Sequence, residues 1–168
     1  QVKIVCCVRD IREIVASFER LHRENQLTKA DPLPSAYADC QTVAGRAEQL
    51  LAKDSVLGLM LNRFRDVFAR KLDDRLIIVP YSQLVANPIG LVSKLSEAVG
   101  STQFTCDPSA VEQLVKEDDS VYGMQLHDVR KTVSAAGSTR WQDYLPQQLG
   151  DHINEQYPYL QQLAGVQL

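Results

Sequence analysis

The sequence predicts an α/β fold in which a parallel sheet is flanked by helices. Two short apolar runs, at residues 4–8 and 76–79, have the composition of buried strands. Segments of helical periodicity separate them, and this alternation is typical of a parallel sheet covered by helices. Because two strands are too few for a stable sheet, we expect part of the domain to lie outside this chain.

Size and composition narrow the functional classes. The 168 residues fit one domain, and 45% hydrophobic with 23% charged residues is ordinary for a globular protein. The net charge of −3 argues against nucleic acid as the main partner, although local basic clusters can still bind a phosphorylated small molecule. No run approaches the roughly 20 apolar residues of a membrane span, and no signal peptide is recognisable. We therefore favour a cytoplasmic location, with a secretory lumen as the alternative. Since a strand begins almost directly after Gln1, we also expect an N-terminal part to be missing.

The first strand passes directly into a helix, and an arginine stands at the junction. Asp10, with Glu13 three residues on, forms a capping-box pattern, and apolar residues of helical period continue to Leu21. Ligands of open α/β sheets bind at the carboxyl ends of strands, and helix N-termini favour anions. Arg9 and the Ser17 hydroxyl are therefore candidates for binding phosphate oxygens. The alternative is a surface pair between Arg9 and Asp10, with Ser17 facing solvent.

Helices and loops make up the rest of the chain. Asn87 before Pro88 predicts a helix start, and Gly100 predicts its end. We interpret the cations at 63, 65, 70 and 71 as a solvated helix face. The expected elements are a loop over 25–39, helices over 39–51 and 55–72, a strand over 76–79 ended by Pro80, helices from 88 and from 107, a loop over 122–140, and a terminal helical region over 147–163 broken at Pro158.

Two further polar groups stand beside element ends. Tyr81 follows the second strand, where its ring could pack on a ligand or simply cover the core edge. The segment 122–146 holds Arg130, Lys131 and Arg140 among glycine and serine, a combination suited to a phosphate group. In the same segment, Trp141 is either a stacking surface or an anchor to the core, and we interpret His127 as structural rather than catalytic.

The four cysteines predict no metal site. Cys6, Cys7, Cys40 and Cys106 show neither CxxC nor Cys/His metal-ligand spacing. We interpret them as small buried hydrophobes in a reducing compartment, although a disulfide between Cys40 and Cys106 stays open. The chain also contains no GxSxG, GxGxxG or GxxxxGK[ST] pattern.

Three segments resemble the sulfotransferases, in the family's order. "VRDIREIVASF" resembles the family's strand–turn–helix, V-R-[DN]-P-R-x-x-x-x-S. "RLIIVPYSQLVANPIGLVSKLSEAVG" resembles the segment in which a strand leads to Y-E-D-L, a spacer with proline and a helix. "VRKTVSAAGSTRW" resembles the C-terminal segment of the tyrosylprotein and TPR-linked branch. Together the three matches span nearly the whole chain.

The resemblance implies a fold like that of the P-loop NTPases. It also implies transfer of a sulfuryl group from 3′-phosphoadenosine-5′-phosphosulfate (PAPS) to a hydroxyl or amine, with 3′-phosphoadenosine-5′-phosphate (PAP) as product. By the same resemblance, residues 1–24 would form the 3′-phosphate motif and 122–146 a loop that covers the nucleotide. The implied contacts are Arg9 and Ser17 to the 3′-phosphate, Tyr81 beside adenine and ribose, and Lys131, Arg140 and the further candidate Arg130 over the phosphates, with Trp141 as the loop anchor.

The sequence also departs from the family pattern. Ile11 replaces a proline, and Ser82 and Gln83 replace an acidic pair. The phosphosulfate-binding loop with its lysine, and the catalytic base, are expected upstream of residue 1, so we assign no catalytic residue. Two alternatives remain: a catalytically inactive sulfotransferase-like module that binds a nucleotide or a protein, and a different P-loop phosphotransferase whose N-terminal half is missing. The acceptor is not predicted.

Overall fold

The chain folds as a mixed α/β structure around one pair of parallel strands. The computed structural model describes residues 2–28, 37, 39–101, 107 and 140–165. Strands β1 (Ile4–Val8) and β2 (Leu76–Pro80) pair in parallel, from Ile4 opposite Leu76 to Val8 opposite Pro80. The helices are α1 (Ile11–Thr28), α3 (Val43–Leu51), α4 (Val56–Ala69), α5 (Tyr81–Ala86), α6 (Pro88–Ala98), α7 (Gln147–Gln156) and α8 (Pro158–Leu163), with single 3₁₀ turns at Asp73–Arg75 and Trp141–Asp143. The predicted fold class is confirmed.

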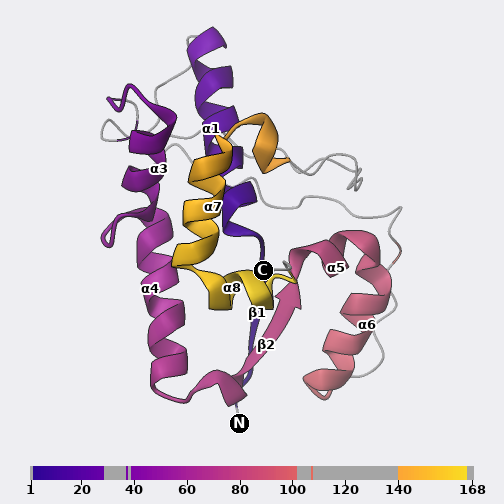
Figure 1. Cartoon of the computed structure of the whole chain (residues 1–168). Coiled ribbons are helices and arrows are strands. Elements are labelled where there is room, and N and C mark those ends of the chain that lie inside the picture. Colours follow the sequence, from indigo (N-terminus) through magenta and orange to yellow (C-terminus); the bar gives the residue numbers. More distant parts are fainter. Residues whose placement is uncertain (1, 29–36, 38, 102–106, 108–139, 166–168) are drawn as a thin grey trace.

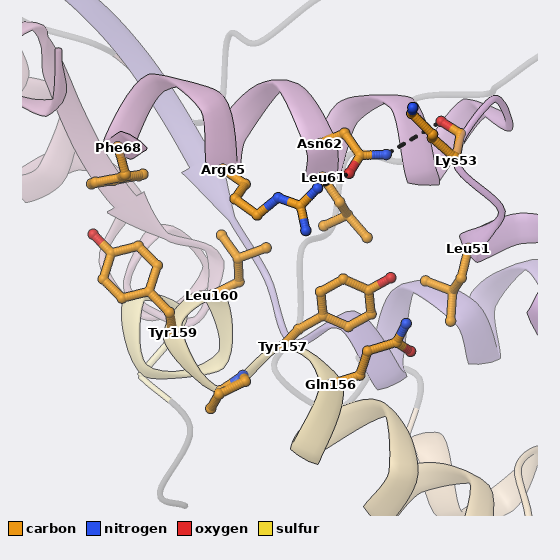
Figure 2. Close-up of a pocket in the computed structure, with 11 residues that line it drawn as sticks. Leu51, Lys53, Leu61, Asn62, Arg65, Phe68, Gln156, Tyr157, Tyr159 and Leu160 are labelled. Atoms are coloured by element: carbon orange, nitrogen blue, oxygen red, sulfur yellow. Dashed lines mark hydrogen bonds between the residues drawn. The ribbon is translucent and has the colours of Figure 1, made fainter. Parts of the chain in front are cut away.

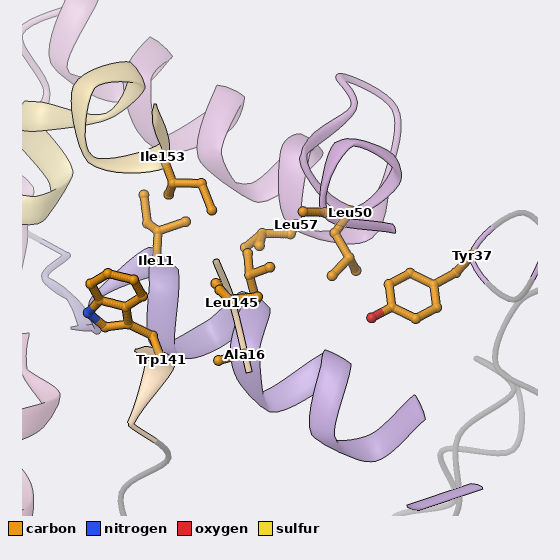
Figure 3. Packing of buried hydrophobic residues seen from close by; sticks show 10 residues of the cluster. Ile11, Ala16, Tyr37, Leu50, Leu57, Trp141, Leu145 and Ile153 are labelled. Carbon is orange, nitrogen blue, oxygen red and sulfur yellow. The ribbon is translucent and has the colours of Figure 1, made fainter. Parts of the chain in front are cut away.

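Helices lie on both sides of the strands. In Figure 1, α5 and α6 lie to the right of the strands, while α3, α4 and α7 lie to the left. The core forms on the left side, where α1 contacts α3 and α7. Its buried side chains, most of them labelled in Figure 3, are Ile11, Val15, Ala16, Tyr37, Ala47, Leu50, Leu57, Trp141, Leu145 and Ile153.

The burial of the first strand differs from the prediction. We expected β1 to be buried, but Ile4 and Val5 are 52% and 48% exposed and Cys7 is also exposed. Val79 in β2 is only 3% exposed. Apolar parallel strands are buried when neighbouring strands and helices cover them. Within the described residues β1 has β2 as its one strand neighbour, so its other edge is uncovered there.

Polar caps set the helix starts. The Thr42 hydroxyl accepts from the Gly45 amide at 3.0 Å, so α3 begins at Val43 rather than near residue 39 as expected. Ser55 caps α4 in the same way, and Asn87 accepts from the Gly90 amide at 3.0 Å, as predicted for α6. Helix α1 continues to residue 28, past the predicted loop start at 25, because no glycine or proline interrupts 11–28.

The predicted helix ends are also largely confirmed. Gly100, two residues after the end of α6, has a φ of +72°, a conformation that glycine adopts without strain. The terminal helical region breaks as expected, with α7 ending before Tyr157 and Pro158 opening α8. The helix expected from 107 and most of the loop expected over 122–140 lie outside the described residues.

A buried ion cluster ties α1 to α3. Glu19 is 1% exposed, and its carboxylate accepts two hydrogen bonds from Arg46, at 2.7 and 2.9 Å. Arg23 donates a third at 2.9 Å, and Arg46 also donates to the Cys40 carbonyl at 2.7 Å. Burial by itself raises the pKa of Glu19, but the bonds from both arginines outweigh it and hold the pKa below its usual range. Glu19 and Arg46 are therefore both charged in the folded chain.

The buried side chain of His22 should make the folded chain less stable in mild acid. His22 is 5% exposed beside Tyr37, and burial together with the charge on Arg46 lowers its pKa. Because the folded pKa lies below the unfolded one, the unfolded chain takes up the proton first as the pH falls below about 6.5. We expect the free energy of unfolding, measured with urea, to fall between pH 7.5 and 5. In His22→Gln this slope should be shallower, whereas exposed His152→Gln should keep it. Equal slopes in all three proteins would contradict the assignment.

The remaining structural findings concern metals, membranes and thiols. Across the described ranges, no three His, Cys, Asp or Glu side chains lie close enough together to hold a metal ion. No described helix is long and apolar enough to span a membrane. The interpretation of the cysteines as buried is wrong for Cys7, which is exposed, while Cys6 and Cys40 are half-buried. Cys106, the candidate disulfide partner of Cys40, lies outside the described residues.

Candidate nucleotide-binding site

The site begins where both strands end. The register places Val8 opposite Pro80, so the next residues, Arg9 and Tyr81, leave the sheet at the same level. The Arg9 guanidinium lies over the Tyr81 ring, 4.7 Å from its centroid. A cation over an aromatic face is held by the ring's quadrupole. Two residues that are 72 positions apart (81 minus 9) thus form one unit at the carboxyl edge of the sheet.

Glu13 positions Arg9 from the helix side. The Arg9 Nε donates to Glu13 Oε2 at 2.8 Å, and both side chains are about a quarter exposed, at 22% and 27%. Within the described part of the chain, the terminal nitrogens of Arg9 have no hydrogen-bond partner. An arginine held through Nε and its ring face still presents these donors to an anion. The alternative of a surface pair with Asp10 is therefore wrong, because Glu13 is the partner.

The N-terminus of α1 is capped from within the chain. The Asp10 carboxylate accepts from the Arg12 amide at 2.9 Å, which confirms Asp10 as the N-cap. The Ile11 amide donates to the Gln161 side chain at 2.9 Å, and Gln161 donates to Asp10 at 2.8 Å. The reciprocal half of the capping box is absent from the described contacts, since Glu13 pairs with Arg9. An anion here would therefore bind the Arg9 side chain rather than these helix amides.

Ser17 extends the same face of α1. It lies one turn after Glu13, about 6 Å further along the axis, and is half-buried. Residues 13 and 17 therefore lie on the same face of α1, and Glu13 on that face contacts Arg9. The arrangement offers a guanidinium and a hydroxyl along one helix face, beside an aromatic ring.

Trp141 anchors the segment that carries Arg140. The indole is 7% exposed, and the Arg12 guanidinium lies 4.9 Å from its ring centroid. Trp141 rests directly on α7 at Gly150, where an added Cβ would lie 2.2 Å from the indole Cζ3. Arg140 precedes it and is exposed. The structure thus supports the anchor interpretation of Trp141 over that of a free stacking surface.

The other candidates are not all brought together. Arg130, Lys131 and His127 lie outside the described residues, so their positions relative to Arg9 stay predictions. Gln161 is not among the candidates predicted from the sequence, but it is fully buried and holds the α1 N-terminus. No sequence signal identifies it, because the contact spans 150 positions and glutamine is common in the terminal region.

Comparison with known proteins identifies the family. A family model described as the sulfotransferase domain matches residues 1–167. The chain therefore belongs to the sulfotransferase family. Neither a curated protein nor a solved structure matches the chain. The parallel strands and surrounding helices are consistent with the fold of this family.

Proposed function

We propose that this chain binds the 3′-phosphoadenosine part of PAPS in a sulfotransferase that acts on a hydroxyl or amine acceptor. The contact between Arg9 and Tyr81 at the carboxyl edge of the strands carries this proposal. It supplies a planar cation for phosphate oxygens and an aromatic ring for the nucleoside, side by side. PAPS itself would supply the sulfuryl group that is transferred.

The residues present fit such a nucleotide. Arg9 would bind the 3′-phosphate through its terminal nitrogens, and the Ser17 hydroxyl would donate to the same group. Tyr81 would pack beside adenine and ribose while it holds the guanidinium in place. Arg140, held next to the anchored Trp141, would add positive charge, and Lys131 and Arg130 would do so from the same segment. The likeness of that segment to the tyrosylprotein and TPR-linked branch supports placing the enzyme there.

Calorimetric titration with PAP, compared with AMP, tests the proposal. AMP lacks only the 3′-phosphate, so we expect PAP to bind more tightly. Arg9→Ala should weaken PAP binding at least about tenfold, because a charge-assisted hydrogen bond is lost, and AMP binding should change far less. Ser17→Ala should weaken PAP binding by a smaller factor. Glu13→Gln should act in the opposite direction, since it removes a negative charge next to the phosphate.

Arg63→Ala is the matched control, because Arg63 is an exposed arginine on α4 with the same charge. It should leave PAP binding unchanged. Equal affinity for PAP and AMP in a folded chain would overturn the nucleotide proposal. A preference for PAP that survives Arg9→Ala would keep the proposal but remove Arg9 from the site.

A further inference from the structure

A pocket lies between α4 and the start of α8, away from the strand edge. Its volume is about 450 Å³, within the range of small-molecule sites. Figure 2 shows side chains of α4 facing those of the segment 156–160 across it. None of its lining residues is Arg9, Ser17 or Tyr81, so it is a different site from the one proposed above.

Much of the pocket lining is apolar. Leu61 and Phe68 come from α4, and Leu160 faces them from α8. Phe68 packs edge-on against Tyr159 at one end of the pocket, with ring centroids 4.8 Å apart. Such a lining favours a ligand with a hydrocarbon part over a ligand that is polar and hydrated throughout.

The two charged residues of the lining are both cations, and both are exposed. Lys53 and Arg65 line the pocket, and no acidic residue does. Arg65 donates through Nη2 to Asn62 at 2.9 Å, and among the residues that the structure describes no carboxylate pairs with it. In Figure 2 its guanidinium extends into the pocket towards Tyr157. Burial raises the pKa of Tyr157, so its hydroxyl stays protonated and able to donate a hydrogen bond.

We propose that this pocket binds a small apolar carboxylate, an aromatic or branched aliphatic monocarboxylic acid. The Arg65 fork matches the two oxygens of a carboxylate, and the leucines and phenylalanine receive the hydrocarbon part. The apolar walls favour an anion with an apolar body over a strongly hydrated polyanion, and Lys53 adds a second positive charge to that of Arg65. The proposal does not depend on nucleotide binding at the strand edge.

Titration of the full chain with phenylacetate, 4-methylpentanoate and the neutral phenylacetamide tests it by calorimetry. We expect both acids to bind saturably and phenylacetamide to bind at least about tenfold more weakly, because it lacks the charge that pairs with Arg65. Arg65→Gln should weaken phenylacetate binding by a similar factor. Arg63→Gln, two positions away on the same helix but outside the lining, should leave it unchanged. Circular dichroism of each variant checks that it is folded.

Three results would overturn the proposal. These are equal affinity for phenylacetate and phenylacetamide, unchanged phenylacetate binding in Arg65→Gln, or no saturable binding of either acid up to about 10 mM. Adding PAP to the same titrations separates the two sites. If Arg65→Gln loses phenylacetate binding but still binds PAP like the unchanged chain, the result supports a carboxylate site in this pocket that is separate from the nucleotide site.

Discussion

Arg46→Met is expected to lower the free energy of unfolding by about 3–5 kcal/mol, because it leaves the buried Glu19 carboxylate without its main partner. Glu19 is 1% exposed, and two of its three described hydrogen bonds come from Arg46. Methionine keeps much of the side-chain volume, so the loss reports mainly the charge. Arg23 cannot compensate, because its side chain is half exposed and already donates to Glu19.

Urea denaturation at pH 7.5 measures this loss, and an exposed ion pair provides the comparison. Arg70 and Asp66 on α4 form an i,i+4 pair with side chains 69% and 57% exposed. Arg70→Met should therefore cost no more than about 0.5 kcal/mol. Replacing both partners of the buried pair, as Glu19→Leu with Arg46→Met, should recover most of the stability, since no buried charge is left unpaired and Arg23, which loses its bond to Glu19, is half exposed. A double variant as unstable as the single one would contradict this account.

Local physics made much of the fold and part of the site predictable. The helix starts at Ser55 and Asn87 follow from side chains that cap the amide three residues on. The breaks at Gly100 and Pro158 follow from backbone geometry. The nearness of Arg9 and Tyr81 follows from topology, because both leave the carboxyl ends of paired parallel strands. Each of these inferences needs only a few neighbouring residues and the order of the elements.

Contacts between distant segments could not be predicted in the same way. Gln161 reaches the N-terminus of α1 through packing of α8, and nothing near Gln161 in the sequence indicates it. Glu13 had two partners available, the Asp10 amide and the Arg9 side chain, and the structure selects the ion pair. Arg65 is exposed, as the prediction of a solvated helix face expects, but its place in a pocket opposite Tyr157 depends on how α4 and α8 pack. Long-range geometry decided each case.

The tryptophan anchor leads to the second large effect, that of Gly150→Ala. The added Cβ would lie 2.2 Å from the Trp141 ring, so the indole or α7 must move. Overpacking of a core commonly costs about 1–3 kcal/mol, and the better helix propensity of alanine returns up to about 1 kcal/mol. With so short an approach we expect the upper end of that range, a net loss of roughly 2 kcal/mol. Because Trp141 is the one tryptophan of the chain, its fluorescence should shift to the red as the ring becomes exposed.

Gly45→Ala on α3 is the matched control. Its Cβ would meet the Thr42 hydroxyl at 3.2 Å, which a small shift can relieve, so stability should change by less than about 1 kcal/mol and the Trp141 emission should stay unchanged. The pair also links the anchor to the proposed function. If Trp141 holds Arg140 over the nucleotide, Gly150→Ala should weaken PAP binding under conditions where the variant is still folded, and Gly45→Ala should not. Weaker PAP binding without a fluorescence shift would show that the loss does not pass through Trp141, and a shift with unchanged PAP binding would remove Arg140 from the site.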